Sequence, residues 1–66
     1  RHGVAQALLA EQERWVRAQG YRRLTVKTRN RFRAMLTMLL AHHYQIVQLE
    51  KKGEVADYRL LLEKNL

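Results

Sequence analysis

Residues 22–50 read RRLTVKTRNRFRAMLTMLLAHHYQIVQLE, and the hydrophobic period of this segment changes twice. Residues 22–28 alternate polar and apolar side chains, several of them β-branched, which predicts a strand. After Asn30, a candidate N-cap, apolar residues recur every three or four positions and predict a helix over residues 31–42. Alternation returns over residues 44–50 and predicts a second strand.

The predicted buried faces follow from the same two periods. In the strand over residues 44–50, Tyr44, Ile46 and Gln48 would share one face. The helix over residues 31–42 is expected to be buried on more than one side, because Met38 and Leu40 broaden its apolar stripe. The stripe itself consists of Phe32, Met35, Leu36, Leu39 and His43.

Both flanks of this segment add regular structure. Residues 4–19 predict an amphipathic helix, and Gly20 stands where a left-handed residue would end it. Its apolar face is expected to contain Val4, Leu8, Trp15 and Ala18, widened by Ala5, Leu9 and Val16, with Glu11 and Glu13 on the wet side. Trp15 is expected to anchor this helix on the sheet. Residues 55–63 alternate again, after the polar break Lys51–Glu54, and predict the second arm of an antiparallel hairpin.

The predicted fold class is therefore α/β (α+β), in the order helix–strand–helix–strand–strand with a C-terminal antiparallel hairpin. We expect one incomplete domain over residues 1–66, because a sheet of three strands would leave open edges that recruit partners. The chain also starts at Arg1 rather than Met. We therefore expect either a homodimer or a missing N-terminal half that completes the sheet.

Composition narrows the class of protein. The 66 residues include 13 Lys and Arg against 6 Asp and Glu, a net charge of +7, and no Cys. A disulfide framework and a thiolate metal site are thereby excluded. The apolar runs are much shorter than the roughly 20 residues of a membrane span, so we expect no membrane partner and a cytoplasmic location.

Two other groups of residues bear on whether the chain binds a metal ion or a nucleic acid. His42 and His43 are adjacent, so on a helix they point about 100° apart and do not converge on a metal ion; we expect no metal. Six basic residues gather around the first predicted strand, which keeps a small nucleic-acid-binding module open as the alternative function. They are Arg22, Arg23, Lys27, Arg29, Arg31 and Arg33.

Four segments together resemble the C-terminal half of a GNAT-superfamily N-acetyltransferase. Residues 1–9, RHGVAQALL, are similar to the end of the acetyl-CoA pyrophosphate loop, with Gly3 and Ala5 at its small positions. The others are Trp15–Gly20 followed by Tyr21; Leu24-Thr25-Val26 with Asn30, Ala34 and Tyr44; and Tyr58–Lys64 as the final strand. The resemblance covers essentially all 66 residues but about half of a family domain. It implies an acetyl-CoA loop and helix over residues 1–20, a strand and second helix over 21–43 and a hairpin over 44–64.

The resemblance implies transfer of an acetyl group from acetyl-CoA to an amine acceptor. A helix N-terminus carries unpaired N–H groups and about half a positive charge, which suits a pyrophosphate. The backbone of Gly3, Val4, Ala5 and Gln6 would bind it, supported by Arg1 and His2, while Asn30 and Ala34 would line the coenzyme side of the second helix.

The catalytic residues stay unknown. The family's proton-donating Tyr would fall at Leu39 and the Gly that follows it at His43. Since leucine cannot donate a proton, and the usual base lies in the missing half, we expect the isolated chain to be inactive.

Overall fold

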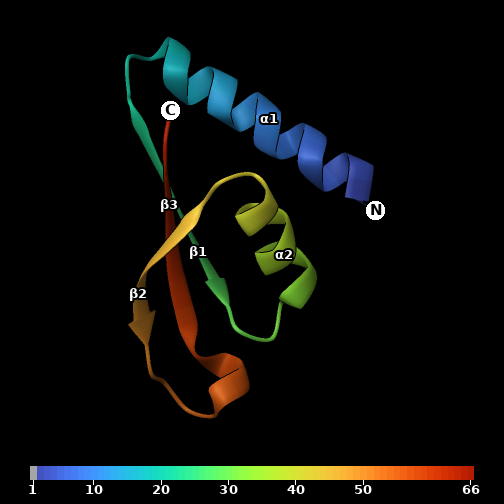
Figure 1. Cartoon of the computed structure of the whole chain (residues 1–66), viewed down its shortest axis with the longest axis vertical. Helices are drawn as coiled ribbons and strands as arrows, with labels where there is room; N and C mark the ends of the chain where they lie inside the picture. Colours follow the sequence, from blue (N-terminus) through green and yellow to red (C-terminus); the bar gives the residue numbers. More distant parts are fainter. Residues whose placement is uncertain (1) are drawn as a thin grey trace.

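The computed structural model describes residues 2–66. It contains two helices, α1 (His2–Ala18) and α2 (Arg33–Ala41), and three strands, β1 (Arg23–Arg29), β2 (Gln45–Glu50) and β3 (Arg59–Asn65). A short 3₁₀ turn, η1 (Val55–Asp57), precedes β3. The predicted α+β class and element order are confirmed (Figure 1). No helix among residues 2–66 is long and apolar enough to cross a bilayer.

The sheet has the order β1–β3–β2, and both neighbouring pairs are antiparallel. The hairpin of β2 and β3 is confirmed, but its connection is longer than Lys51–Glu54. The strand expected from residue 55 is wrong, because Val55–Asp57 turns instead: the Asp57 N–H donates to the Glu54 carbonyl at 2.8 Å. The Arg31 N–H donates to the Ala56 carbonyl at 2.9 Å, which holds the turn against the end of β1.

A bulge in β2 changes which side chains face the core. Ile46 is opposite Leu62, whereas Gln48 is opposite Leu61 and Leu49 is opposite Leu60. Because one extra residue is inserted around Val47, Leu49 joins Ile46 on one face and Gln48 moves to the other. The prediction that Ile46 and Gln48 share a face is therefore wrong.

The core lies between one face of the sheet and the two helices. Leu36 and Leu39 of α2 pack with Leu60 and Leu62 of β3, and Leu62 is fully buried. Leu9 of α1 and Tyr44 complete the cluster. The expectation that α2 is buried on more than one side is wrong, since Met35 and Leu40 are exposed.

Helix α1 presents a different face to the core from the one expected. Leu9 is buried and Val16 half-buried, while Val4, Leu8 and Trp15 are about 60–66% exposed. Trp15 is therefore not an anchor on the sheet. The helix therefore has two apolar stripes, an exposed one with Val4, Leu8 and Trp15 and a buried one with Leu9 and Val16. The buried stripe also carries Glu13, whose contacts are described below.

Both helices end in the same hydrogen-bond pattern. At the end of α1 the Gly20 N–H donates to the Arg17 carbonyl at 3.0 Å and the Tyr21 N–H to the Val16 carbonyl at 3.2 Å. This is a Schellman motif, and Gly20 has the expected left-handed conformation with φ of 91°. At the end of α2, the His43 N–H donates to the Leu40 carbonyl and the Tyr44 N–H to the Leu39 carbonyl.

His43 occupies the left-handed position of the second motif, with φ of 75°. A residue with a side chain costs about 1–2 kcal/mol in the left-handed region, and glycine avoids this cost. Part of that gain is lost, because glycine gives up more conformational entropy on folding. We expect His43→Gly to raise the free energy of unfolding by up to about 1 kcal/mol in denaturant titrations. His42→Gly is the matched control, because φ of −95° at His42 needs no glycine; it should lower stability instead. Equal effects of the two changes would contradict this explanation.

The start of α2 differs from the prediction. Its N-cap is Phe32, without a side-chain cap bond, and not Asn30. Asn30 lies three residues before the helix and uses its side chain elsewhere: Nδ2 donates to the Val55 carbonyl at 3.2 Å, and its backbone N–H donates to the Tyr58 carbonyl at 2.8 Å. A long-range contact with η1 has replaced the local cap.

Candidate functional site

The first turn of α1 carries three of the predicted pyrophosphate-binding residues, Gly3, Val4 and Ala5, whereas Gln6 begins the second turn, where the helical pattern pairs its N–H with the His2 carbonyl. Gly3, Val4 and Gln6 are exposed and Ala5 is half-exposed. The first N–H groups of a helix have no partner within the helix, and this first turn holds no acidic side chain to repel an anion. Arg1 lies outside the described residues; His2 begins the helix.

Gly3 has no role in packing. A Cβ built at this position would meet no atom within 4 Å. Glycine within a helical turn costs about 0.5–1 kcal/mol relative to alanine. The fold of residues 2–66 therefore gives no steric reason for a glycine here, whereas close approach of a ligand to the backbone would give one.

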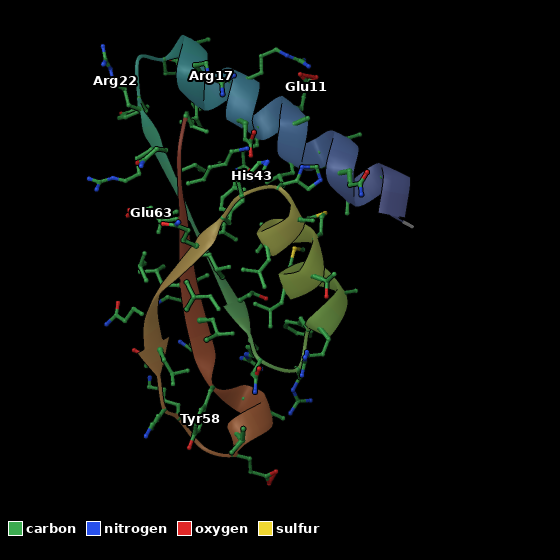
Figure 2. The ribbon with its side chains drawn as sticks, in the orientation of Figure 1. Glu11, Arg17, Arg22, His43, Tyr58 and Glu63 are labelled. Atoms are coloured by element: carbon green, nitrogen blue, oxygen red, sulfur yellow. The ribbon has the colours of Figure 1, made fainter. Side chains whose placement is uncertain are left out.

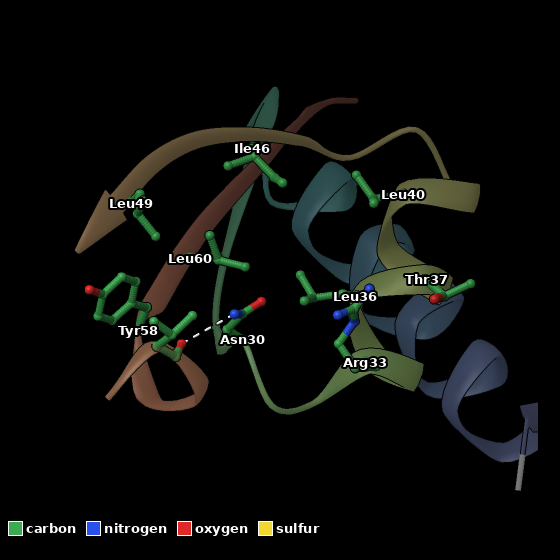
Figure 3. A pocket seen from close by; sticks show the side chains of 10 residues that line it. Asn30, Arg33, Leu36, Thr37, Leu40, Ile46, Leu49, Tyr58 and Leu60 are labelled. Carbon is green, nitrogen blue, oxygen red and sulfur yellow. Dashed lines mark hydrogen bonds between the residues drawn. The ribbon is translucent and has the colours of Figure 1, made fainter. Parts of the chain in front are cut away.

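Asn30 and Ala34, the other predicted binding residues, lie near the start of α2. Asn30 borders a groove of about 520 Å³ between α2 and the β2–β3 hairpin, whereas Ala34 is exposed and does not line it. Figure 3 shows Leu36 and Leu40 of α2 facing the strands across this groove. In the described part of the chain, no hydrogen bond or ion pair joins Asn30 or Ala34 to the first turn of α1.

A polar cluster that the sequence did not reveal joins α1 to the sheet. The Tyr44 hydroxyl donates to Glu13 Oε2 at 2.8 Å, and Lys64 Nζ lies 3.1 Å from both carboxylate oxygens of Glu13. Lys64 Nζ also lies 5.5 Å from the centre of the Tyr44 ring. Spacing gave one clue, because Glu13 is one turn after Leu9 on the same helical face.

The cluster is a structural contact that joins α1, β3 and the residue before β2. The side chains of Glu13 and Lys64 are only 14% and 20% exposed, and Tyr44 is 2% exposed. Burial, followed by the hydrogen bond to Glu13 and its negative charge, raises the pKa of Tyr44 well above its ordinary range. Tyr44 therefore stays protonated in the folded chain, and its hydroxyl is already donated to Glu13.

The six basic residues expected near β1 do not form one surface. Arg23 lies 3.8 Å from Glu63, and Arg31 pairs with Asp57 at 2.6 Å. Arg33 lines the groove beside α2. Lys27 and Arg29 alternate with the core-facing residues of β1, so they lie on the sheet face that neither helix covers.

Arginines lie at both ends of the molecule. Figure 2 shows Arg17 and Arg22 at one end of the molecule and Tyr58 at the other. At the Tyr58 end, Arg29 is directly opposite Arg59 in the β1–β3 register. No group of three His, Cys, Asp or Glu side chains that could hold a metal ion occurs among residues 2–66.

Comparison with known proteins adds no relative. The chain matches no protein-family model, no curated protein sequence and no solved structure.

Proposed function

We propose that this chain is the acetyl-CoA-binding half of an N-acetyltransferase, which transfers an acetyl group to an amine acceptor. The observation that carries the proposal is the first turn of α1: its residues Gly3 to Ala5 are exposed or half-exposed, it holds no acidic side chain, and its second residue is a glycine that packing does not require. These are the properties of a helix terminus that receives a phosphate. A cytoplasmic location is part of the same proposal.

The residues present fit the diphosphate part of the coenzyme. The backbone N–H groups of Gly3, Val4 and Ala5 would donate to its oxygens, and the small side chain of Ala5 leaves room for the diphosphate beside them. The predicted contribution of the Gln6 N–H is not part of this proposal, because in a helix that begins at His2 this N–H follows the i→i−4 pattern to the His2 carbonyl. Bound acetyl-CoA supplies an activated thioester, so the acyl group needs no further activation by this chain. The chain's own task is to bind and orient the coenzyme.

The end of α2 supports the family resemblance independently. The motif places a glycine at His43, and His43 has the left-handed conformation that favours glycine. Leu39, at the position of the proton donor, is 1% exposed and apolar. We therefore propose that acid and base come from a missing N-terminal half or from a second copy, and that residues 1–66 alone do not transfer acetyl groups.

Gly3→Ala separates a coenzyme role from a structural role. The added Cβ meets nothing in the free chain, so thermal stability should stay equal or increase, by at most about 1 kcal/mol. Calorimetric affinity for acetyl-CoA should fall about tenfold, since the methyl group keeps the diphosphate from the N–H groups. Ala10→Leu, at an exposed position two turns further along α1, is the control and should leave affinity unchanged.

Either of two results would overturn the proposal: no saturable binding of acetyl-CoA to the unchanged chain, or equal affinity of the Gly3→Ala variant. The same titration with a single-stranded RNA tests the alternative. The uncovered sheet face favours that alternative through Lys27, Arg29 and Arg59, but Arg23 and Arg31 are already paired with carboxylates. RNA binding that falls steeply with salt, without coenzyme binding, would establish it.

A further inference from the structure

A hollow of about 290 Å³ lies where β1 ends and β3 begins. Three cations line it, Arg29 from β1, Lys52 from the loop after β2 and Arg59 from β3. Gly53 and Asp57 complete the lining. The hollow lies toward the end of the molecule marked by Tyr58 in Figure 2, whereas α1 meets β1 at the end marked by Arg22. None of its lining residues belongs to α1, so the hollow is distinct from the first turn of that helix.

Two of the three cations of this hollow are neighbours across the sheet. Arg29 and Arg59 are direct cross-strand partners, an arrangement that is unfavourable for like charges. Within residues 2–66, neither arginine nor Lys52 forms an ion pair within 4.0 Å. The repulsion between these charges lowers the stability of the free chain, and a bound anion would remove it.

Two carboxylates lie close enough to compete with an anion. Asp57 lines the hollow but pairs with Arg31 at 2.6 Å. Glu50 is the cross-strand partner of Arg59 on the β2 side, and one of its oxygens is buried without a hydrogen-bond partner. Arg29, Arg31, Lys52 and Arg59 still outnumber these two carboxylates, so the local charge stays positive.

We propose that this hollow binds the phosphate group of a small phosphorylated molecule. A guanidinium presents parallel N–H donors that match two phosphate oxygens, and two guanidinium groups on adjacent strands would hold a dianion from two sides. Lys52 adds a charge from the loop above. The proposal does not depend on acetyl-CoA binding at α1.

The test uses inorganic phosphate and pyrophosphate as probes of the full chain. Thermal unfolding is measured in phosphate and in sodium chloride of equal ionic strength, and amide shifts are followed by NMR. We expect a saturable rise of the melting temperature in phosphate alone, with shifts concentrated at Arg29, Lys52, Gly53 and Arg59. Arg59→Gln should weaken phosphate binding about tenfold.

Arg29→Thr gives a second, opposite readout. Loss of the cross-strand repulsion should make this variant more stable than the unchanged chain in chloride, while the stabilisation by phosphate disappears. Arg22→Gln removes one exposed positive charge at the other end of the sheet and is the matched control. It should keep the full phosphate response.

Four results would overturn the proposal. Equal stabilisation by chloride, or an equal loss in Arg22→Gln, would mean screening of net charge. Pyrophosphate shifts confined to Gly3–Gln6 would assign the anion to α1, supporting the proposed function but not this site. Binding of a short single-stranded DNA across the whole uncovered face, without a response to phosphate, would mean a nucleic-acid surface.

Discussion

The Leu62→Ala variant is expected to be largely unfolded under conditions in which the unchanged chain is folded. Leu62 is fully buried at the centre of β3, between Val26 of β1 and Ile46 of β2 in the register. Truncation of a buried leucine lowers the free energy of unfolding by about 2–5 kcal/mol. A chain of this length has about 3–10 kcal/mol in total, so the loss approaches the whole.

Urea titration followed by circular dichroism measures this loss. Val47→Ala is the control, because Val47 is in the bulge of β2 and is half-exposed. It should cost less than about 1 kcal/mol. A loss below 1 kcal/mol for Leu62→Ala would show that the centre of the core lies elsewhere, and the packing of both helices against β3 would have to be revised.

Period and turn chemistry were sufficient to predict the order of the elements, because each depends on neighbours in the sequence. Alternation located β1 and β3 to within a few residues, and Gly20 marked the end of α1. Val55–Asp57 was mistaken for a strand because the alternation of side chains says nothing about the backbone. The turn there is held by hydrogen bonds to backbone carbonyl groups, one of which comes from the distant Arg31. The bulge around Val47 was equally invisible, since it becomes visible only through pairing with β3.

The candidate sites divide in the same way. The candidate site at the first turn of α1 was predicted from Gly3 and Ala5 together with the family resemblance, because a helix terminus is a local feature of the sequence. The hollow at Arg29 and Arg59 could not, since these residues are 30 positions apart in the printed numbering and become neighbours only through the β1–β3 register. Which face of α1 is buried also depends on a distant contact, that of Glu13 with Tyr44 and Lys64.

The Glu13→Ala variant should lower the free energy of unfolding by about 2–4 kcal/mol. The change leaves the buried Tyr44 hydroxyl without its acceptor and the Lys64 ammonium without its counter-charge. An unpaired group costs more than the intact contact contributes, since the remaining partner stays desolvated. Replacing all three residues by apolar ones of similar size, Glu13→Leu with Tyr44→Phe and Lys64→Met, should therefore be nearly neutral.

The pH dependence identifies the tyrosine in this cluster. Because the pKa of Tyr44 is raised in the folded chain, the unfolded chain loses this proton first as the pH passes about 10. The stabilisation is complete below that pH and is lost progressively above it. Tyr44→Phe should reduce the alkaline loss of stability measured by urea titration, whereas Tyr21→Phe, at an exposed tyrosine, should not.

Since Glu13 holds both partners, its removal should also release α1 from the sheet, and hydrogen-exchange protection of α1 amides should fall more than that of β3. A uniform loss across both elements would mean that the cluster supports the whole fold and not the position of α1.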